Sequence, residues 1–467
     1  MTTIARELLT GTTPEELPLN VLQAQLSGRV IIPGDADYDD ARRVPITSFY
    51  EHPQVIVRAA SAEDVAAAVR FAREHGLRIA VRSGGHSVAG YSVVDGSLVI
   101  DLSQMKAVSI HPASRTARVQ PGATSGDIAP AAQQYGLAVS TGDAASVGIG
   151  GLATGGGIGW MVRKFGLTID AIVGVEVVTA EGEIIQATAD EHADLFWAVR
   201  GGGGNFGIVT AFELRLQPVG MVLGGIIALP PTREVLRGLM DYVVRAPEEL
   251  TTIAQVMHLP PAPFVSPEFH GNLAVIVFVC WAGEVEAGQR ALQPIRALAA
   301  PFVDMVQPMP YEAMFELTRE ATLPHSVAIR SMYLREFPDA VIDTTLAHMP
   351  KATSPIAMFQ IRGLGGAFAR VPSDATAFAH RDKQYMATII NLWEGDDVTG
   401  AHHAWTQAFW EDIRAYGDGA YVNFLQDEGA DRIRDAYPQG TYERLAEVKR
   451  RYDPQNVFNL NQNIAPK

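Results

Sequence analysis

Apolar residues near the start of the chain recur at spacings that predict strands with one helix between them. The run 55–58 is β-branched, and apolar residues alternate along 77–81, as in a strand with one buried face. Between these runs, Ser61 precedes acidic residues and a helical apolar spacing, and Gly76 marks the end of that helix. Strand, helix and strand therefore deliver the chain to a glycine-rich stretch that begins at Arg82.

The same mixture of short elements continues as far as Pro218, which marks a boundary. Its further predicted members are strands at 30–32, 98–102 and 117–119, a helix at 122–135, a hairpin of 175–178 with 183–187, and a strand ending at 216. Beyond the boundary, the runs 274–280 and 357–362 predict strands between amphipathic helices. A strand at 420–423 and a capped helix at 441–451 follow. The pattern as a whole predicts an α+β fold.

Composition narrows the class of protein. The 467 residues, 47% hydrophobic and 19% charged, suffice for two or three domains. A net charge of −15 argues against a nucleic-acid partner or an anionic membrane, and no apolar run approaches the roughly 18 residues of a membrane-spanning helix. Cys280 is the only cysteine, so we expect no internal disulfide and no metal site. The first residues lack the order of a secretory signal, and we therefore expect a cytoplasmic protein.

Glycine-rich stretches carry the strongest functional signal. The glycines of Arg82-Ser-Gly-Gly-His86 let the backbone approach a phosphate or a flat cofactor, with the imidazole emerging beside it. Seven glycines lie within 148–159, where each would cost about 1 kcal/mol relative to alanine in a helix interior. Free N–H groups there can bind a dinucleotide pyrophosphate, although a flexible loop is the competing interpretation. A G-x-G-x-x-A spacing also begins at Gly148, but the polar segment 141–146 is not the strand that a Rossmann site needs.

Four stretches in a fixed order together resemble one family. They are Arg82-Ser-Gly-Gly-His86, Val147-Gly-Ile-Gly-Gly151 through Gly157, Leu195-Phe-Trp-Ala-Val-Arg-Gly-Gly-Gly-Gly-Asn-Phe-Gly207, and Arg444-Leu-Ala-Glu-Val-Lys449 with Tyr452-Asp-Pro454. The chain resembles the berberine-bridge-enzyme branch of the vanillyl-alcohol-oxidase flavoproteins, and in particular its bacterial members with a single flavin link. The resemblance is strong over 45–217 and 420–467 and weak between them. It implies a two-part FAD-binding domain of the PCMH type, residues 1–218 and 416–467, with an antiparallel-sheet-plus-helices substrate domain inserted at 219–415.

The resemblance also implies how FAD is held. His86 falls on the histidine that bonds the flavin covalently, while Ala144 stands where many members have a second, cysteine link, so a single attachment is expected. Leu152 agrees with the singly linked members, and Val147 occupies the position where oxidases keep a small residue that leaves oxygen a route to the flavin. The residues expected to contact the cofactor are Arg82, Ser83, Gly84, Gly85, His86, Ser87, Thr141, Gly142, Val147, Gly148, Gly150, Gly151, Leu152, Thr154, Gly155, Gly157, Asn205, Gly207, Ile208, Val209, Tyr421 and Asn423.

The function implied is that of an FAD-linked oxidase. A small organic substrate, whether an alcohol, an amine or a sugar, gives a hydride to the flavin, a base takes a proton, and molecular oxygen reoxidises the flavin with release of hydrogen peroxide. Tyr421 matches the family's Tyr-x-Asn and is the first candidate for the base, against the alternative that it only stacks on the cofactor. Further candidates are Gln360, Arg362, His380 and Thr388.

Two other functions stay open. A flavin-dependent oxygenase or cyclase of natural-product biosynthesis would yield an oxygenated or cyclised product instead of hydrogen peroxide. A non-catalytic flavin-binding protein would show no bleaching of its flavin by any substrate. The oligomeric state is not indicated by the sequence.

Overall fold

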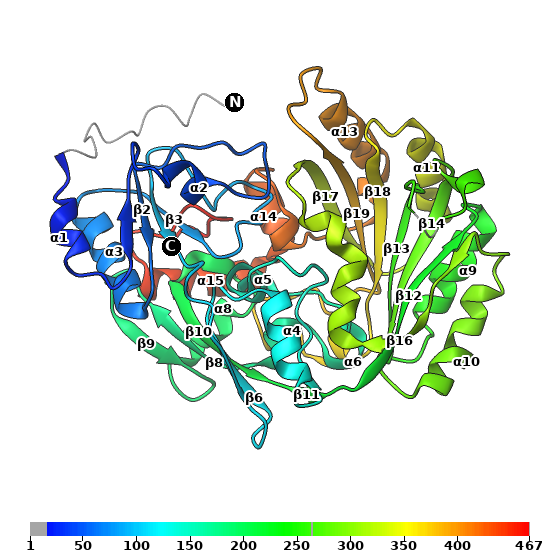
Figure 1. Cartoon of the computed structure of the whole chain (residues 1–467), viewed down its shortest axis with the longest axis horizontal. Coiled ribbons are helices and arrows are strands. Elements are labelled where there is room, and N and C mark those ends of the chain that lie inside the picture. The colour runs from blue at the N-terminus through cyan, green and yellow to red at the C-terminus, as the bar shows by residue number, and fades with distance from the viewer. Residues whose placement is uncertain (1–15, 263–264, 467) are drawn as a thin grey trace.

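The computed structural model describes residues 16–262 and 265–466, which form two lobes side by side (Figure 1). One lobe combines the N-terminal residues with the C-terminal ones, and the other holds the middle of the chain, as the colours of Figure 1 show. The start of the chain, from which we argued against a secretory signal, lies outside the described residues. No helix among the described residues is both long enough and apolar enough to cross a membrane.

A small four-stranded sheet opens the first lobe. Its strands lie in the order β1 (Arg29–Ile31), β2 (Val55–Arg58), β4 (Leu98–Asp101) and β3 (Ile79–Arg82). The strands β2, β4 and β3 are parallel, and α3 (Ala62–Glu74) crosses between β2 and β3 with Ser61 capping its first turn. The predicted strand-helix-strand unit therefore exists, and the end of β3 leads into the first glycine loop.

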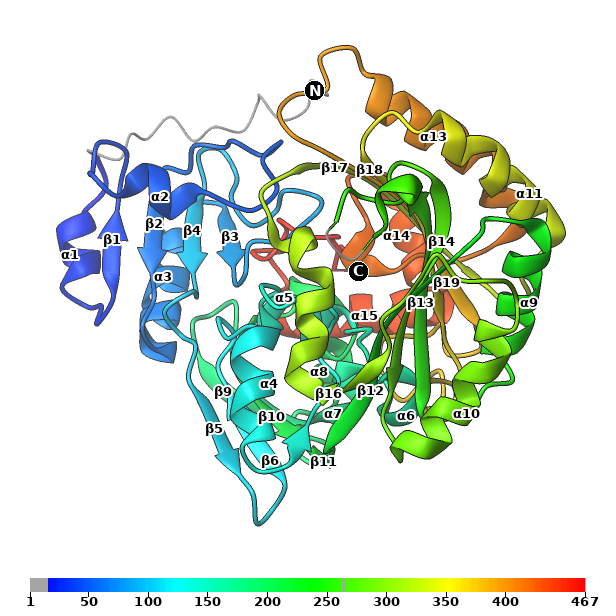
Figure 2. The same ribbon diagram turned by 45° about the vertical axis from the view of Figure 1, so that its right-hand side comes forward.

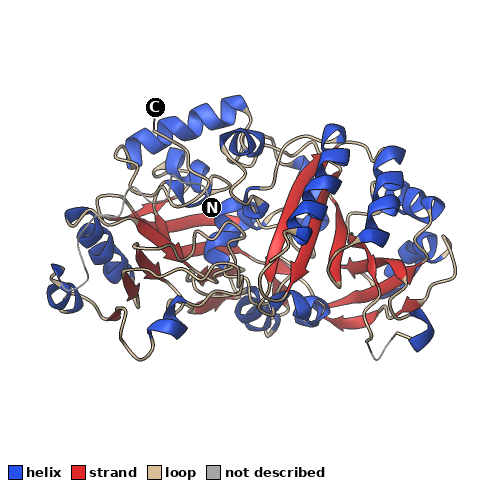
Figure 3. Ribbon diagram, turned by 90° about the horizontal axis from the view of Figure 1, so that it is seen from above, coloured by secondary structure: helices blue, strands red, loops and turns tan. Residues whose placement is uncertain are grey.

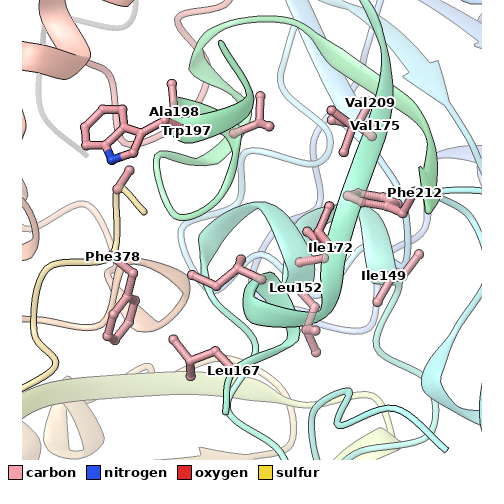
Figure 4. Packing of buried hydrophobic residues seen from close by; sticks show 14 of the residues in the cluster. Ile149, Leu152, Leu167, Ile172, Val175, Trp197, Ala198, Val209, Phe212 and Phe378 are labelled. Atoms are coloured by element: carbon pink, nitrogen blue, oxygen red, sulfur yellow. The ribbon is translucent and has the colours of Figure 1, made fainter. Parts of the chain in front are cut away.

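A five-stranded antiparallel sheet follows. It contains β5 (Val108–His111), β6 (Thr116–Val119), β10 (Ile208–Arg215), β8 (Ile172–Val178) and β9 (Ile184–Ala187), in that order. The short helix α5 (Ile149–Gly155) packs on this sheet. Figure 4 shows its residues Ile149 and Leu152 in one buried cluster with Ile172 of β8 and Phe212 of β10. The segment before α5 is not a strand, which agrees with our rejection of a Rossmann site.

The second lobe is one large antiparallel sheet with helices on its outer face (Figures 2 and 3). Its strands run in the order β15 (Val303–Asp304), β12 (Met221–Leu229), β14 (Leu273–Trp281), β13 (Leu250–His258), β18 (Ile356–Gly363), β19 (Tyr385–Trp393) and β17 (Ser326–Leu334), and β16 (Gln307–Pro310) also pairs with β12. The covering helices are α9 (Arg233–Val243), α10 (Val285–Arg296), α11 (Asp339–His348) and α13 (Ala401–Ile413). The other face of the sheet turns toward the first lobe. The α+β fold with an antiparallel sheet and helices in the middle of the chain is confirmed.

The last part of the chain returns to the first lobe through α14 (Ala430–Ala436) and α15 (Gln439–Tyr452). Lys449 is fully buried there and binds the Asp453 carboxylate at 2.7 Å. The same ammonium group donates to the Asn205 carbonyl at 2.7 Å. The Asn205 side chain accepts from the Ile464 N–H at 2.9 Å and donates to the Gln462 carbonyl at 3.2 Å. The C-terminal segment is thus fastened to the glycine loop around residue 205.

Two predicted elements differ from the structure. The segment 420–423 is not a strand; a short 3₁₀ turn, Val422–Phe424, follows Tyr421 instead, closed by the Phe424 N–H on the Tyr421 carbonyl at 2.8 Å. The helix predicted from residue 122 begins only at Ser125, because Thr124 and Asp127 form a capping box that fixes its first turn. In the large sheet, β12, β13, β17 and β19 were not predicted, since nearly every residue of each strand is buried, so none shows the alternation of a half-exposed strand.

Candidate active site

A cavity of about 460 Å³ lies between the two lobes, within the range of about 300–1,000 Å³ typical of ligand sites. Four segments of the first lobe line it, namely 83–89, 142–154, 203–209 and 421–425, and the inner face of the large sheet closes the opposite side. Residues far apart in the sequence therefore meet at one place, and most of those expected to contact a cofactor are among them.

Two glycine loops form the back of the cavity by packing backbone against backbone. A side-chain carbon on Gly84 would lie 2.4 Å from the Gly148 nitrogen, and one on Gly148 would lie 2.2 Å from Ser83 Oγ. Gly85 has φ +74, a left-handed conformation that favours glycine. In contrast, Gly151 lines the cavity with no atom within 4 Å of its missing side chain, which leaves its backbone open to a ligand.

The end of the 148–159 stretch is crowded by protein rather than facing the cavity. A carbon on Gly155 would lie 2.0 Å from Asn423 Oδ1, and one on Gly157 would lie 2.1 Å from Thr168 Oγ1. Gly156, at φ +145, lies against the ring of Tyr421. Of the glycines in 148–159, only Gly151 has open space where a side chain would lie. Gly155 and Gly157 were expected to contact the cofactor, but neither lines the cavity, and close packing against the protein accounts for both.

His86 lies at the cavity beside the second loop, and Ser146 holds one side of its ring. Ser146 Oγ is 2.9 Å from His86 Nε2. Burial, with a smaller contribution from nearby His325, lowers the pKa of His86 to about 4, although the Ser146 backbone acts in the opposite direction. The imidazole is therefore neutral at physiological pH, and its Nδ1 carries a free lone pair, and so can act as a nucleophile, in the tautomer whose Nε2–H donates to Ser146 Oγ.

Tyr421 and Asn423 reach the cavity from the 3₁₀ turn. The Tyr421 hydroxyl accepts a hydrogen bond from the Gly157 N–H at 2.9 Å and another from the Asn423 amide at 3.0 Å. Burial raises the pKa of Tyr421, although these two donors and the nearby Arg362 guanidinium all act to lower it. The net shift of this pKa is upward, so the side chain is a neutral phenol at physiological pH. Its own proton is free to be donated into the cavity.

An ion pair crosses the cavity between the lobes. Arg362, on β18, lies 2.7 Å from the carboxylate of Asp143, and its Nε donates to Gln360 Oε1 at 2.9 Å. All three residues line the cavity. Within the described part of the chain, Asp143 is the one carboxylate of the lining, and it is already neutralised. The cavity therefore presents no free negative charge to an anionic ligand.

Besides Gly155 and Gly157, four residues from the sequence analysis lie outside the cavity lining. Arg82 is buried in an ion pair with Asp101 at 2.7 Å, where it supports the small sheet. His380 turns its Nε2 to the Asp435 carbonyl at 2.8 Å and stacks on the ring of Tyr333, so it is not placed to act as a base. Thr141 and Thr388 are buried behind the lining. Thr388 Oγ1 has no hydrogen-bond partner among the described residues.

Several lining residues were missed by reasoning from the sequence. Asp143, Ser146, Gln255 and His325 carry polar groups into the cavity or onto its histidine. The serine and the aspartate lie within the polar segment that we had used only to reject a nucleotide fold. Gln255 could have been noticed as the polar residue in the middle of the otherwise apolar stretch 253–257 of β13.

The lining fits a dinucleotide flavin. Open glycine backbone at Gly151 and Gly204 permits close approach of phosphates, and no unpaired carboxylate in the described lining would repel them. His86 and Val147 lie at the same cavity as Tyr421 and Asn423, where a ring system could contact both pairs. Across the described residues, no three His, Cys, Asp or Glu side chains come together to hold a metal ion.

Comparison with known families gives two matches at opposite ends of the chain. Residues 53–188 match a model described as FAD binding domain. Residues 420–465 match one described as berberine and berberine like.

Individual relatives match over nearly the whole chain. It is similar to (R)-6-hydroxynicotine oxidase of Paenarthrobacter nicotinovorans, with 31% identity covering 94% of this chain and 97% of the relative. It is also similar to a carbohydrate oxidase of Microdochium nivale, with 27% identity covering 99% and 98%. The crystal structure of 6-hydroxy-D-nicotine oxidase from Arthrobacter nicotinovorans superposes with a TM-score of 0.86 at 30% identity, covering 95% of this chain and 98% of that one.

Proposed function

Because the chain belongs to the berberine-bridge-enzyme-like family of FAD-linked oxidoreductases, we propose that it is an oxidase that carries FAD on His86 alone. The electrons come from a small organic substrate and pass to molecular oxygen, which leaves as hydrogen peroxide. The observation that carries this proposal is the neutral, Ser146-held imidazole of His86 beside an open glycine cradle. Bound FAD would supply the two-electron acceptor.

A single attachment is supported by the place of the only cysteine. Ala144 lines the cavity at the position where a second link would start. Cys280 is fully buried in the large sheet, where burial raises the pKa of its thiol to about 12. A thiol in that state is a poor nucleophile. His86 is therefore the one group that we assign to covalent attachment.

The residues on the substrate side position and polarise the reacting group. Oxidation would break a C–H bond and an O–H or N–H bond of the substrate and form a C=O or C=N bond. The two electrons would be accepted by bound FAD, and molecular oxygen would finally take up the two electrons and two protons as hydrogen peroxide. Tyr421 has both acceptor directions occupied, so we assign its O–H to a hydrogen bond with the substrate heteroatom. Gln360, steadied by Arg362, offers an amide to the same region. Val147 lines the cavity and leaves oxygen a route to the flavin.

Loss of covalent flavin from one variant tests the proposal. Fluorescence of the denatured protein band should disappear in His86→Ala and persist in His111→Ala, which changes an exposed histidine. The wild-type holoenzyme should form one hydrogen peroxide per substrate oxidised. Fluorescence that persists in His86→Ala would place the attachment elsewhere, and an oxygenated product without hydrogen peroxide would favour the oxygenase alternative.

A further inference from the structure

The face of the large sheet that lines the cavity is divided into a polar row and an apolar row. Strand register places four polar residues side by side across four strands: Gln255, Gln360, Thr388 and Ser331. Two residues away on each strand, in the same direction across the sheet, lies a row of apolar residues. Its members are Met257, Met358, Ile390 and Ile329. Side chains two positions apart point to the same face of a strand. Gln255 and Gln360 of the polar row line the cavity, as do Met358, Ile390 and Ile329 of the apolar row. This wall therefore changes from polar to apolar between neighbouring ladder positions.

The polar row offers amides but no charge. Gln255 lines the cavity and makes no side-chain hydrogen bond to any described residue, so its amide is available to a ligand. Gln360 gives its oxygen to Arg362, which leaves its NH₂ group for the cavity. The positive charge of Arg362 is matched by Asp143 at 2.7 Å. An ionised ligand would thus find no unpaired counter-charge on this wall, and burying it there would be unfavourable.

The apolar row continues along the strands by one more register position. Beyond Met358, Ile390 and Ile329, the next register position pairs Leu392 with Val327, and these five residues all line the cavity. A molecule lying along them exchanges water for hydrocarbon contact, which favours apolar ligands by about 25 cal/mol for each Å² buried. A saccharide would instead bury hydroxyl groups without partners, each costing about 1–3 kcal/mol.

We infer that the substrate is a small, uncharged and predominantly apolar alcohol or amine, not a saccharide or a carboxylate. Its reacting heteroatom lies toward Tyr421 and the polar row, and its hydrocarbon body lies on the apolar row. This inference rests on the proposed function and adds the substrate class to it.

Three compounds that each contain one six-membered ring test the inference on the flavin-loaded enzyme. Cyclohexylmethanol, glucose and cyclohexanecarboxylate would be titrated without oxygen while the flavin absorbance spectrum is recorded. We expect cyclohexylmethanol to shift or bleach the spectrum with a dissociation constant at least about tenfold below those of the other two, the scale expected from burying one apolar side chain's worth of surface.

One substitution tests whether the ligand contacts the apolar row. Met358→Gln keeps the length of the side chain and should weaken cyclohexylmethanol by about tenfold while leaving glucose unchanged, because only the apolar contact is lost. Ile184→Ser, on an exposed position of β9, is the matched control and should change neither. The melting temperatures of both variants are compared with that of the wild type, so that a loss of affinity caused by unfolding is recognised.

The outcomes separate the substrate class from the oxidase function. Tighter binding of glucose or cyclohexanecarboxylate, or no response to cyclohexylmethanol, would overturn the substrate class. Bleaching by glucose with hydrogen peroxide release would do so while leaving the oxidase in place. Selective binding of cyclohexylmethanol would support the substrate class even if the flavin were never reduced. Absence of flavin reduction would count against the oxidase function, not against the substrate class. Equal affinity in wild type and a folded Met358→Gln would also overturn the inference.

Discussion

The two walls of the cavity are built by opposite means. On the first lobe, glycine loops bring the backbone itself to the surface, and two of these loops fit only because neither Gly84 nor Gly148 has a side chain. On the second lobe, a regular antiparallel sheet keeps its backbone paired and presents side chains such as Gln360 and Met358. A backbone wall suits a constant ligand such as a cofactor, whereas a side-chain wall can change its specificity without changing the fold.

The largest expected effect lies where the two walls meet, at Tyr421. Tyr421→Phe keeps the ring but removes the hydroxyl that faces the substrate. We expect anaerobic flavin reduction, by whichever substrate reduces the flavin fastest, to fall about 10²-fold, at the lower end of the range for a positioned acid or base because the phenol is neutral. Tyr135→Phe, at an exposed position, should leave the rate unchanged. A loss below about tenfold, on the same scale, would assign Tyr421 to packing.

The backbone wall is tested next by adding one methyl group. Gly148→Ala places a carbon 2.2 Å from Ser83 Oγ and should lower the free energy of unfolding of the apoprotein by about 1–3 kcal/mol, as overpacking does. Gly151→Ala, inside α5, has no atom within 4 Å of the added carbon and should leave apoprotein stability unchanged or raise it by up to about 1 kcal/mol, but reduce flavin content. Equal stability of the two variants in denaturant titrations would mean that the glycine loops do not need each other.

Oxygen access provides a smaller test on the same wall. Val147→Leu narrows the cavity beside the flavin, and stopped-flow reoxidation of reduced enzyme should slow by about tenfold, or about 1.4 kcal/mol in the barrier. Anaerobic reduction by substrate should be nearly unchanged, as should both rates in Val108→Leu, whose side chain packs away from the cavity. Unaltered reoxidation would remove Val147 from the oxygen route.

The smallest effect is expected at Ser146. Ser146→Ala removes the hydrogen bond to His86 Nε2 and should slow covalent attachment of FAD to the apoprotein about twofold to tenfold, matching a net hydrogen-bond contribution of about 0.5–1.5 kcal/mol. Ser146→Thr keeps the hydroxyl and should restore the rate, and Ser114→Ala, at an exposed serine, serves as the control. Attachment as fast in Ser146→Ala as in wild type would show that the ring is oriented by its burial alone.

The difference between the walls also decides what could be predicted from the sequence. Glycine clusters are rare in sequences, so Gly84, Gly148 and their neighbours could be predicted to form the backbone wall. The motif around His86 indicated the covalent attachment of a flavin. The strands β12, β13, β17 and β19 are buried along nearly their whole length, so their sequences show no half-exposed alternation from which their order or register could be inferred. Without register, Gln255 and Gln360 could not be recognised as neighbours, and the partners of Arg362 and His380 could not be assigned.

The fastening of Asn205 by the C-terminal segment has a consequence for how the protein is made. The loop around residue 205 is held by Lys449, Gln462 and Ile464, which a ribosome adds more than two hundred residues later. A nascent chain can fold its small sheet early, since domains form from the N-terminus during synthesis, but this part of the cavity lacks its partners until those residues have emerged. Retention of a ligand by that loop therefore requires an intact C-terminal segment. A chain that ends before residue 449 would fail to retain the ligand, which would distinguish it from the full chain.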